Sequence, residues 1–199
     1  MTVPDAAAKL REMIPYEFSA ERFSRWMAYV LRHNPERYGL QTDQHGFVNV
    51  DEFMKIAQRR YPELDMHRLQ ELITSSGATR FELSGDRVRA RYGHSIPVEP
   101  VGPPVTPPEE LFYGTDLSRL DALLAAGLNP MDRRMLHLSE TVDEALSIAR
   151  RKSEQPAILR IRAREAADAG VSFYLEGAVH LASFVPSRFL ERFGPPARS

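Results

Sequence analysis

Residues 97–108 read PVEPVGPPVTPP, with six prolines in twelve positions. Proline fixes the backbone angle φ and has no amide hydrogen to donate, which disfavours the interior of both helices and sheets. We therefore predict an extended linker over residues 97–108. It would join two lobes, residues 19–96 and 109–199, and residues 1–18 would form a separate N-terminal extension.

The composition on both sides of the linker excludes several kinds of site. The 199-residue chain has no cysteine, which rules out disulfides and cysteine zinc sites. Its histidines show no metal-ligand spacing, so we expect no metal. The formal net charge is −1, so a phosphate-binding surface must be a local cluster. No apolar run reaches the roughly 20 residues that cross a bilayer, so we expect a cytoplasmic monomer without a membrane partner.

The first lobe is predicted to contain helices followed by a β-hairpin. Ser19 is a good N-cap for a helix of helically spaced apolar residues that ends at Asn34, before a proline. A turn at 43–46 and a short strand at 47–50 follow. Asp51 and Asp65 are then expected to cap two further helices, through about residues 60 and 76.

The third helix is expected to close at Gly77, and the hairpin follows it. Strands at 80–84 and 87–92 flank the turn Gly85-Asp86, and a two-residue loop that begins with glycine is a recognised hairpin signal. Helices followed by a hairpin are typical of winged-helix domains, which are relatives of the helix-turn-helix. We therefore predict a winged-helix-like first lobe.

The second lobe alternates short strands and helices. We expect strands at residues 111–115, 135–138, 157–162 and 179–185. We expect one helix over 117–126, ending at Gly127, and another from a cap at Ser139 or Thr141 to about residue 152. This pattern predicts an α+β fold with a mixed β-sheet in the second lobe.

Several basic residues allow two interpretations. Arg32-His33 fits a cation pair at a helix C-terminus as well as a site. Arg87, Arg89 and Arg91 share one face of a strand, which is either a solvated face with Glu82 and Asp86 as partners or a phosphate site. The residue types alone do not decide between these.

Four further features are ordinary when taken alone. Residues 93–95 read GHS, which is most simply a turn, and Arg133-Arg134 is most simply a basic turn. His137 fits a core histidine. Phe173-Tyr174 fits core or pocket packing.

Taken together and in order, these segments resemble the RNA 2′-phosphotransferase family of the KptA type. The segments are SRWMAYVLRHNP at 24–35, GLQTDQHGFVNVD at 39–51, RFEL at 80–83 with VRARYGHSI at 88–96, and MDRRMLHLS at 131–139. The resemblance covers residues 22–193. It is specific because several motifs are collinear and separated by similar lengths.

The resemblance implies a reaction in two steps. An RNA 2′-phosphate attacks C1″ of NAD and expels nicotinamide, and the ribose O2″ then attacks the phosphate. The products are RNA with a 2′-hydroxyl and ADP-ribose 1″,2″-cyclic phosphate. An Arg-His-Arg-Arg tetrad of the family falls on Arg32, His33, Arg89 and Arg133, and His33 is a candidate for proton transfer.

The same resemblance implies two sets of binding residues. An ADP-ribosyltransferase-like second lobe would bind NAD, as co-substrate, through Tyr113, Gly114, Thr115, His137, Leu138, Ser139 and Phe173. Arg91, His94 and Ser95 would contact RNA that bears an internal 2′-phosphate, as in tRNA splicing and RNA repair, or a terminal phosphate.

Three places depart from the family pattern, all in the second lobe. Tyr113 and Met135 stand where the family has histidines, and residues 173–182 are shortened, with His180 in place of tryptophan. Three alternatives therefore stay open. One is a transferase that stops after the first step, leaving ADP-ribose on an RNA phosphate. Another is an RNA-binding protein without activity, and the third is a winged-helix DNA regulator.

Overall fold

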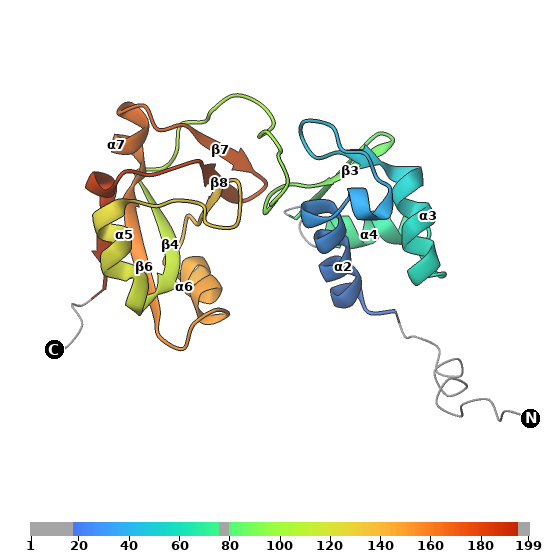
Figure 1. Ribbon diagram of the computed structural model, residues 1–199, viewed down its shortest axis with the longest axis horizontal. Helices are drawn as coiled ribbons and strands as arrows, with labels where there is room; N and C mark the ends of the chain where they lie inside the picture. Colours follow the sequence, from blue (N-terminus) through green and yellow to red (C-terminus); the bar gives the residue numbers. More distant parts are fainter. Residues whose placement is uncertain (1–17, 76–79, 195–199) are drawn as a thin grey trace, which may run out of the picture.

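The computed structural model describes residues 18–75 and 80–194, and it has an α+β architecture in two lobes. Figure 1 shows the helical first lobe on one side and the sheet-rich second lobe on the other, joined by an extended segment. No helix among the described residues is long and apolar enough to span a membrane. The predicted limits of the extension, lobes and linker remain predictions.

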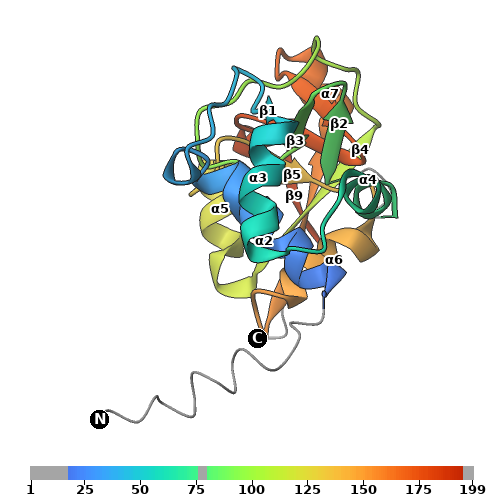
Figure 2. The ribbon, with the colours of Figure 1, turned by 90° about the vertical axis from the view of Figure 1, so that its right-hand side faces the viewer.

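The first lobe packs its helices against a small antiparallel sheet. Its helices are α2 (Ala20–His33), the 3-10 helix η1 (Glu36–Tyr38), α3 (Val50–Arg60) and α4 (Met66–Ser75). Its strands are β1 (Val48–Asn49), β2 (Phe81–Ser84) and β3 (Arg87–Ala90), in the order β1-β3-β2. Phe23, Leu31, Phe53 and Val88 lie in one buried core, so the helices and the sheet share apolar packing. Figure 2 views the molecule from this lobe, with α2 and α3 in front.

Local sequence signals explain most of these boundaries. The Ser19 side chain accepts a hydrogen bond from the Arg22 amide, and Asp65 accepts one from the Arg68 amide, as predicted for N-caps. The prediction of Asp51 as the second cap is wrong. Asn49 caps α3 instead, because its side-chain oxygen accepts from two amides and β1 is only two residues long.

The predicted hairpin is confirmed. Ser84 pairs with Arg87, which leaves Gly85-Asp86 as the loop, and Gly85 has a φ of 60° that favours glycine. The predicted helix end at Gly77 lies outside the described residues.

The second lobe contains two three-stranded sheets. One has the order β4-β6-β9, made of β4 (Glu110–Asp116), β6 (Pro156–Arg162) and β9 (Leu190–Phe193). The other has the order β5-β8-β7, made of β5 (Leu136–Leu138), β8 (Val179–Ala182) and β7 (Phe173–Glu176). The described strand pairs are all antiparallel, so the prediction of a mixed sheet is wrong. Strand residues alone do not set direction, which depends on how the connections return.

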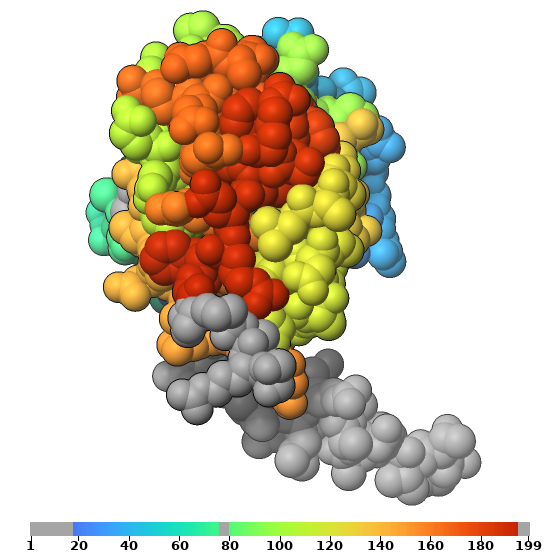
Figure 3. Space-filling model, turned by 90° about the vertical axis from the view of Figure 1, so that its left-hand side faces the viewer, coloured from blue at the N-terminus to red at the C-terminus, as the bar shows by residue number. Residues whose placement is uncertain are grey.

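Helices cover the ends and one outer face of these sheets. They are η2 (Leu117–Arg119), α5 (Leu120–Ala126), α6 (Val142–Arg150), α7 (Ala163–Asp168) and η3 (Ser187–Phe189). Thr141 caps α6, whereas Ser139, the other predicted cap, is paired through its backbone with Phe112. On the face farthest from the first lobe, α5 lies beside the C-terminal segment (Figure 3), where Arg192 and Asp121 form an ion pair.

The β5-β8-β7 sheet is covered on both faces. Leu136, Leu138 and Phe173 point into the core shared with β4 and β6. Because side chains alternate along a strand, His137 and Glu176 point to the opposite face, toward the first lobe. Figure 1 shows β7 and β8 on that side of the second lobe. One face of this sheet therefore packs in the core of the second lobe, and the other face lies at the junction with the first lobe.

The proline-rich segment is attached to both lobes. The amide of Glu99 donates to the Gln44 carbonyl at 2.8 Å, and the amide of Val105 donates to the Phe173 carbonyl at 2.7 Å. It contains no helix and takes part in one isolated β-bridge, at Val105. The segment is extended as predicted, and in addition it is hydrogen-bonded at both ends.

The packing of α6 on β4 predicts that Gly114→Ala is destabilising. A Cβ at Gly114 would lie 2.1 Å from the backbone oxygen of Ala145, so α6 would have to move. We expect the free energy of unfolding to fall by about 1–3 kcal/mol, measured by urea denaturation. Ser147→Ala is the control, since Ser147 is exposed on α6 and alanine there removes only a 3.5 Å hydrogen bond from Arg151. Equal stability of Gly114→Ala and the wild type would contradict the close contact.

Candidate functional site

The end of α2 places Arg32 against the segment that follows β3. The Arg32 guanidinium carbon lies 5.1 Å from the centre of the Tyr92 ring. Gly93 has a φ of 90°, and a Cβ there would lie 3.2 Å from Nη1 of Arg32. Nε and Nη2 of Arg32 are buried without a hydrogen-bond partner. These donors are the groups that an incoming acceptor would satisfy.

His33 lies beside Arg32 and is held by the same segment. Its Nδ1 and the hydroxyl oxygen of Ser95 are joined by a hydrogen bond of 2.9 Å. The Ser95 amide donates to the Arg32 carbonyl at 3.1 Å, which fixes this segment to the helix end. The His33 ring remains exposed, so it is accessible from solvent.

The second lobe completes the cluster with Arg133 and His137. Arg133 Nη1 donates to Nδ1 of His137, and the His137 ring lies 5.5 Å from the Tyr92 ring, nearly perpendicular to it. The Arg134 amide donates to the His94 carbonyl at 3.1 Å. The two lobes therefore bring Arg32 and His33 close to Arg133 and His137.

Burial and neighbouring positive charges lower the pKa of two cations in this cluster. Burial, followed by the charges of Arg80 and Arg133, lowers the Arg32 pKa to about 10, against an opposing effect of Tyr92. Burial also lowers the pKa of Lys152, with help from Arg133 and Arg119. Both lowered pKa values mean that the surroundings of Arg32 and Lys152 disfavour the protonated, positively charged form of each side chain.

The histidines of the cluster shift in the same direction. Burial, followed by the charges of Arg32 and Arg89, lowers the pKa of His94 from 6.5 to about 4. Burial, followed by the charges of Arg133 and Arg32, lowers that of His137 to about 3. Burial and the same two arginines, Arg32 and Arg133, lower the His33 pKa. All three rings are therefore mainly neutral at pH 7.

The cations of this cluster have no carboxylate partner. Among the ion pairs of residues 18–75 and 80–194, none involves Arg32, Arg133 or Lys152. We call these three residues, with His33 and His137, the anion site. Fixed cations with free donors beside neutral imidazoles are suited to bind a phosphate and to accept or donate a proton.

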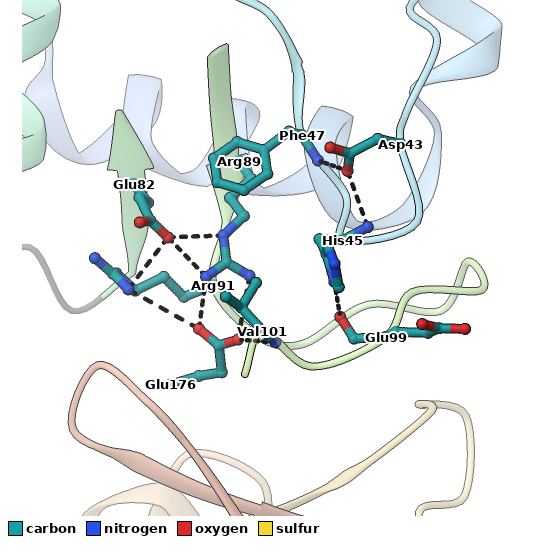
Figure 4. Close-up of polar contacts among 9 residues, drawn as sticks. All are labelled: Asp43, His45, Phe47, Glu82, Arg89, Arg91, Glu99, Val101 and Glu176. Carbon is teal, nitrogen blue, oxygen red and sulfur yellow. Dashed lines mark hydrogen bonds and ion pairs between the residues drawn. The ribbon is translucent and has the colours of Figure 1, made fainter. Parts of the chain in front are cut away.

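Arg89 and Arg91 lie outside the anion site. Arg89 is only 2% exposed and is paired with Glu82 and Glu176, and Arg91 contacts the same two carboxylates (Figure 4). The sequence offered Glu82 and Asp86 as partners for the arginines of this strand, and Glu82 forms ion pairs with Arg89 and Arg91. The structure therefore joins three of the four predicted tetrad residues and places Arg89 in a neighbouring ionic cluster.

The predicted NAD residues fall into four environments. His137 belongs to the anion site. Leu138 and Phe173 are fully buried in the core, at 0% exposure. Tyr113, Thr115 and Ser139 lie where β4 meets β5, joined by the bridge between Phe112 and Ser139. Gly114 packs against α6, so its lack of a side chain already has a structural reason.

The comparison with known proteins decides the family. The family model described as "RNA 2'-phosphotransferase, Tpt1 / KptA family" matches residues 19–181. The chain belongs to this family. A "Probable RNA 2'-phosphotransferase 1" of Archaeoglobus fulgidus is 31% identical over 182 residues, covering 91% of this chain and 84% of that protein.

Two further family members are similar over comparable lengths. A "Probable RNA 2'-phosphotransferase" of Lacticaseibacillus paracasei is 39% identical over 171 residues, covering 85% of this chain and 91% of that protein. One of Thermococcus kodakarensis is 38% identical over 157 residues, covering 79% and 87% respectively. The similarity therefore extends across both lobes of this family member.

The structure adds residues to the site that sequence reasoning missed. Lys152 follows α6 and is close enough to lower the pKa of His137, and Tyr92 packs between Arg32 and His137. A lysine that follows a helix is common in proteins, so the sequence alone gave no reason to place Lys152 in a site. Tyr92 lies between the RFE and GHS motifs of the family. The resemblance could therefore have indicated its position, but not its packing against Arg32 and His137.

A small cavity lies between the lobes. A cavity of about 20 Å³ there is lined by residues that include His94, Met135, His137 and Glu176. That volume holds about one water molecule. His33 and Arg133 are exposed outside this cavity.

The low pKa values of His94 and His137 predict acid sensitivity. Between about pH 6.5 and pH 4 the unfolded chain binds protons that the folded protein excludes, so the free energy of unfolding falls as pH falls. Each histidine contributes roughly 1 kcal/mol per pH unit. We expect His137→Asn to lose less stability than the wild type between pH 7 and pH 5 in urea titrations. An identical loss in both proteins would contradict the assigned shift.

The uncompensated charge predicts that inorganic phosphate stabilises the protein through Arg32. Phosphate at about ten times its dissociation constant would add about 1.4 kcal/mol to the free energy of unfolding. We expect Arg32→Gln to lose this gain. Arg25→Gln is the matched control, since Arg25 is on the same helix but exposed and paired with Glu21. Equal gains in the two variants would show that phosphate binds elsewhere.

Proposed function

We propose that this chain removes a 2′-phosphate from RNA by transferring it to NAD. The observation that carries the proposal is the anion site, in which Arg32 and Arg133 from different lobes converge, neither paired with a carboxylate of residues 18–75 or 80–194. Membership of the RNA 2′-phosphotransferase family and the names of the relatives support it. NAD dependence and the cyclic-phosphate product come from the family resemblance.

The first step needs positioning more than it needs a base. A phosphate oxygen of the RNA forms a bond to C1″ of NAD, and the C1″–nitrogen bond breaks to release nicotinamide. The nucleophile is already anionic, and NAD carries its own negative pyrophosphate, so the main requirement is to bring them together. The guanidinium groups of Arg32 and Arg133 can neutralise and aim the phosphate.

The second step needs proton transfer. The ribose O2″ attacks phosphorus, the bond from phosphorus to the RNA O2′ breaks, and a proton moves from O2″ to O2′. His33 is exposed, has a lowered pKa and is oriented by Ser95, so it can accept the proton from O2″ and return it to O2′. The cations stabilise the additional negative charge on the pentacoordinate phosphorus.

The lobes would divide the substrates between them. We assign RNA to a winged-helix-like first lobe, with His94 and Ser95 beside the anion site. We assign NAD to an ADP-ribosyltransferase-like second lobe, where Tyr113 and Thr115 lie on β4 and Ser139 directly follows β5, paired through its backbone with Phe112. Thr115 and Ser139 are 8% and 7% exposed, so only their edges are accessible.

The test uses an RNA oligonucleotide with one internal 2′-phosphate, incubated with the protein with and without NAD. We expect NAD-dependent loss of the phosphate and formation of ADP-ribose cyclic phosphate, resolved by mass. Arg133→Ala should lower the rate about 100-fold, the usual scale for removing one charge-stabilising donor. Arg25→Gln is the control that should keep the wild-type rate.

Other outcomes would select the remaining alternatives. An RNA that accumulates with ADP-ribose attached would indicate a transferase that stops after the first step. Tight binding of the phosphorylated RNA without release of nicotinamide would indicate a binding protein. Preference for a specific DNA duplex would indicate a regulator, and either of the last two results would overturn the proposal.

A further inference from the structure

Beside the anion site, four charged residues form a closed ionic cluster. Arg89 Nε donates to Glu82 Oε2 at 2.8 Å, and its Nη1 and Nη2 donate to the two oxygens of Glu176 at 3.2 and 2.8 Å. Arg91 Nη1 lies 3.2 Å from Glu82 Oε2 and 3.9 Å from Glu176 Oε2. Figure 4 shows the two carboxylates on either side of the arginines.

Carboxylates occupy both two-donor edges of the Arg89 guanidinium. Glu176 takes one edge in the two-point geometry with which a guanidinium also binds phosphate. Glu82 takes the other edge, and the ring of Phe47 lies 4.9 Å from the guanidinium carbon. Arg89 and Glu176 are each only 2% exposed. A phosphate could bind either edge of Arg89 only by displacing the partly exposed Glu82 or the buried Glu176.

The charge balance distinguishes this cluster from the anion site. Two arginines face two glutamates here, so the cluster is neutral. The anion site holds Arg32, Arg133 and Lys152, with no ion-pair partner among the described residues. An RNA phosphate therefore gains more from the anion site than from replacing Glu176, because a displaced buried carboxylate would lose its partner.

Glu176 joins three parts of the chain. Arg89 is on β3 of the first lobe and Glu176 is on β7 of the second. The Val101 amide, in the proline-rich segment, donates to Glu176 Oε1 at 3.0 Å. The segment that follows β3 is hydrogen-bonded through Ser95 to Arg32 and His33. In the second lobe, β7 pairs with β8, and β8 pairs with β5, which carries His137.

We propose that Glu176 is a positioning residue, which with Arg89 forms an interlobe clasp that sets the distance between the two halves of the anion site. Arg89 then contributes through the clasp and not by touching the RNA phosphate. The catalytic part of this inference rests on the proposed function. It changes the role that the family resemblance gives to Arg89.

The first test compares Glu176→Gln, Arg89→Met and the double variant Arg89→Met/Glu176→Leu in the NAD-dependent reaction. A buried ion pair can be replaced by apolar side chains, whereas removing one partner leaves a buried charge. Glu82 keeps Arg91 as a partner in all three. We expect each single variant to lower kcat at least ten-fold with little change in KM, and the double variant to recover to within three-fold of the wild type.

A direct role of Arg89 predicts the opposite pattern. If Arg89 touched the phosphate, Glu176→Gln would be neutral or faster, and the double variant would be as inactive as Arg89→Met. Either result overturns the clasp. Arg87→Met is the matched control, because Arg87 is on the same strand but half exposed and paired with Asp43 at the surface, so its rate should be unchanged.

A second test does not depend on activity. The chain has no cysteine, so Lys55→Cys and Asp168→Cys place one spin label on each lobe, at exposed positions of α3 and α7. We expect a narrow interlabel distance distribution in the otherwise wild-type protein and in the double variant, and a broad one with Glu176→Gln. An unchanged distribution with Glu176→Gln overturns the clasp. A wild-type protein without NAD-dependent activity would instead overturn the proposed function, and the labels would still decide the clasp.

Discussion

Positive side chains that have no carboxylate partner in the described part of the chain meet where the two lobes join, and their repulsion has to be balanced by other contacts. Arg32 from the first lobe and Arg133 from the second lower the pKa of the groups around them. The opposing contacts are the buried pair of Arg89 and Glu176 and the backbone hydrogen bond from Arg134 to His94. The molecule thus keeps one ionic cluster neutral and leaves the adjacent one positively charged.

The sequence predicts the features that depend on neighbours in the chain. Ser19 and Asp65 cap their helices, and the Gly85-Asp86 hairpin forms as predicted, because each needs only a few adjacent residues. Arg32, His33 and Arg133 entered the candidate site through the family resemblance, since basic residues at a helix end or in a turn are ordinary by themselves. Their meeting across two lobes is a property of the fold.

The features that the sequence did not predict depend on distant contacts. Arg89 and Glu176 are 87 residues apart, and neither position indicates the other. The direction of the second-lobe strands, and the strands β7 and β9 themselves, follow from how the chain returns across the sheets. The Asn49 cap was missed because Asp51 is an equally good capping residue, and the end of a two-residue strand decides between them.

The attachment of the proline-rich segment has a consequence for how the lobes find each other. A flexible tether only raises the local concentration of one partner near the other, and its length can change with little effect. Here Glu99 and Val105 are hydrogen-bonded to opposite lobes, and Val101 between them donates to Glu176. The segment is therefore part of the interface, and its length is a fixed dimension of the molecule. Extra residues between 99 and 105 would break the register of these bonds, so related chains should vary this stretch in composition more readily than in length.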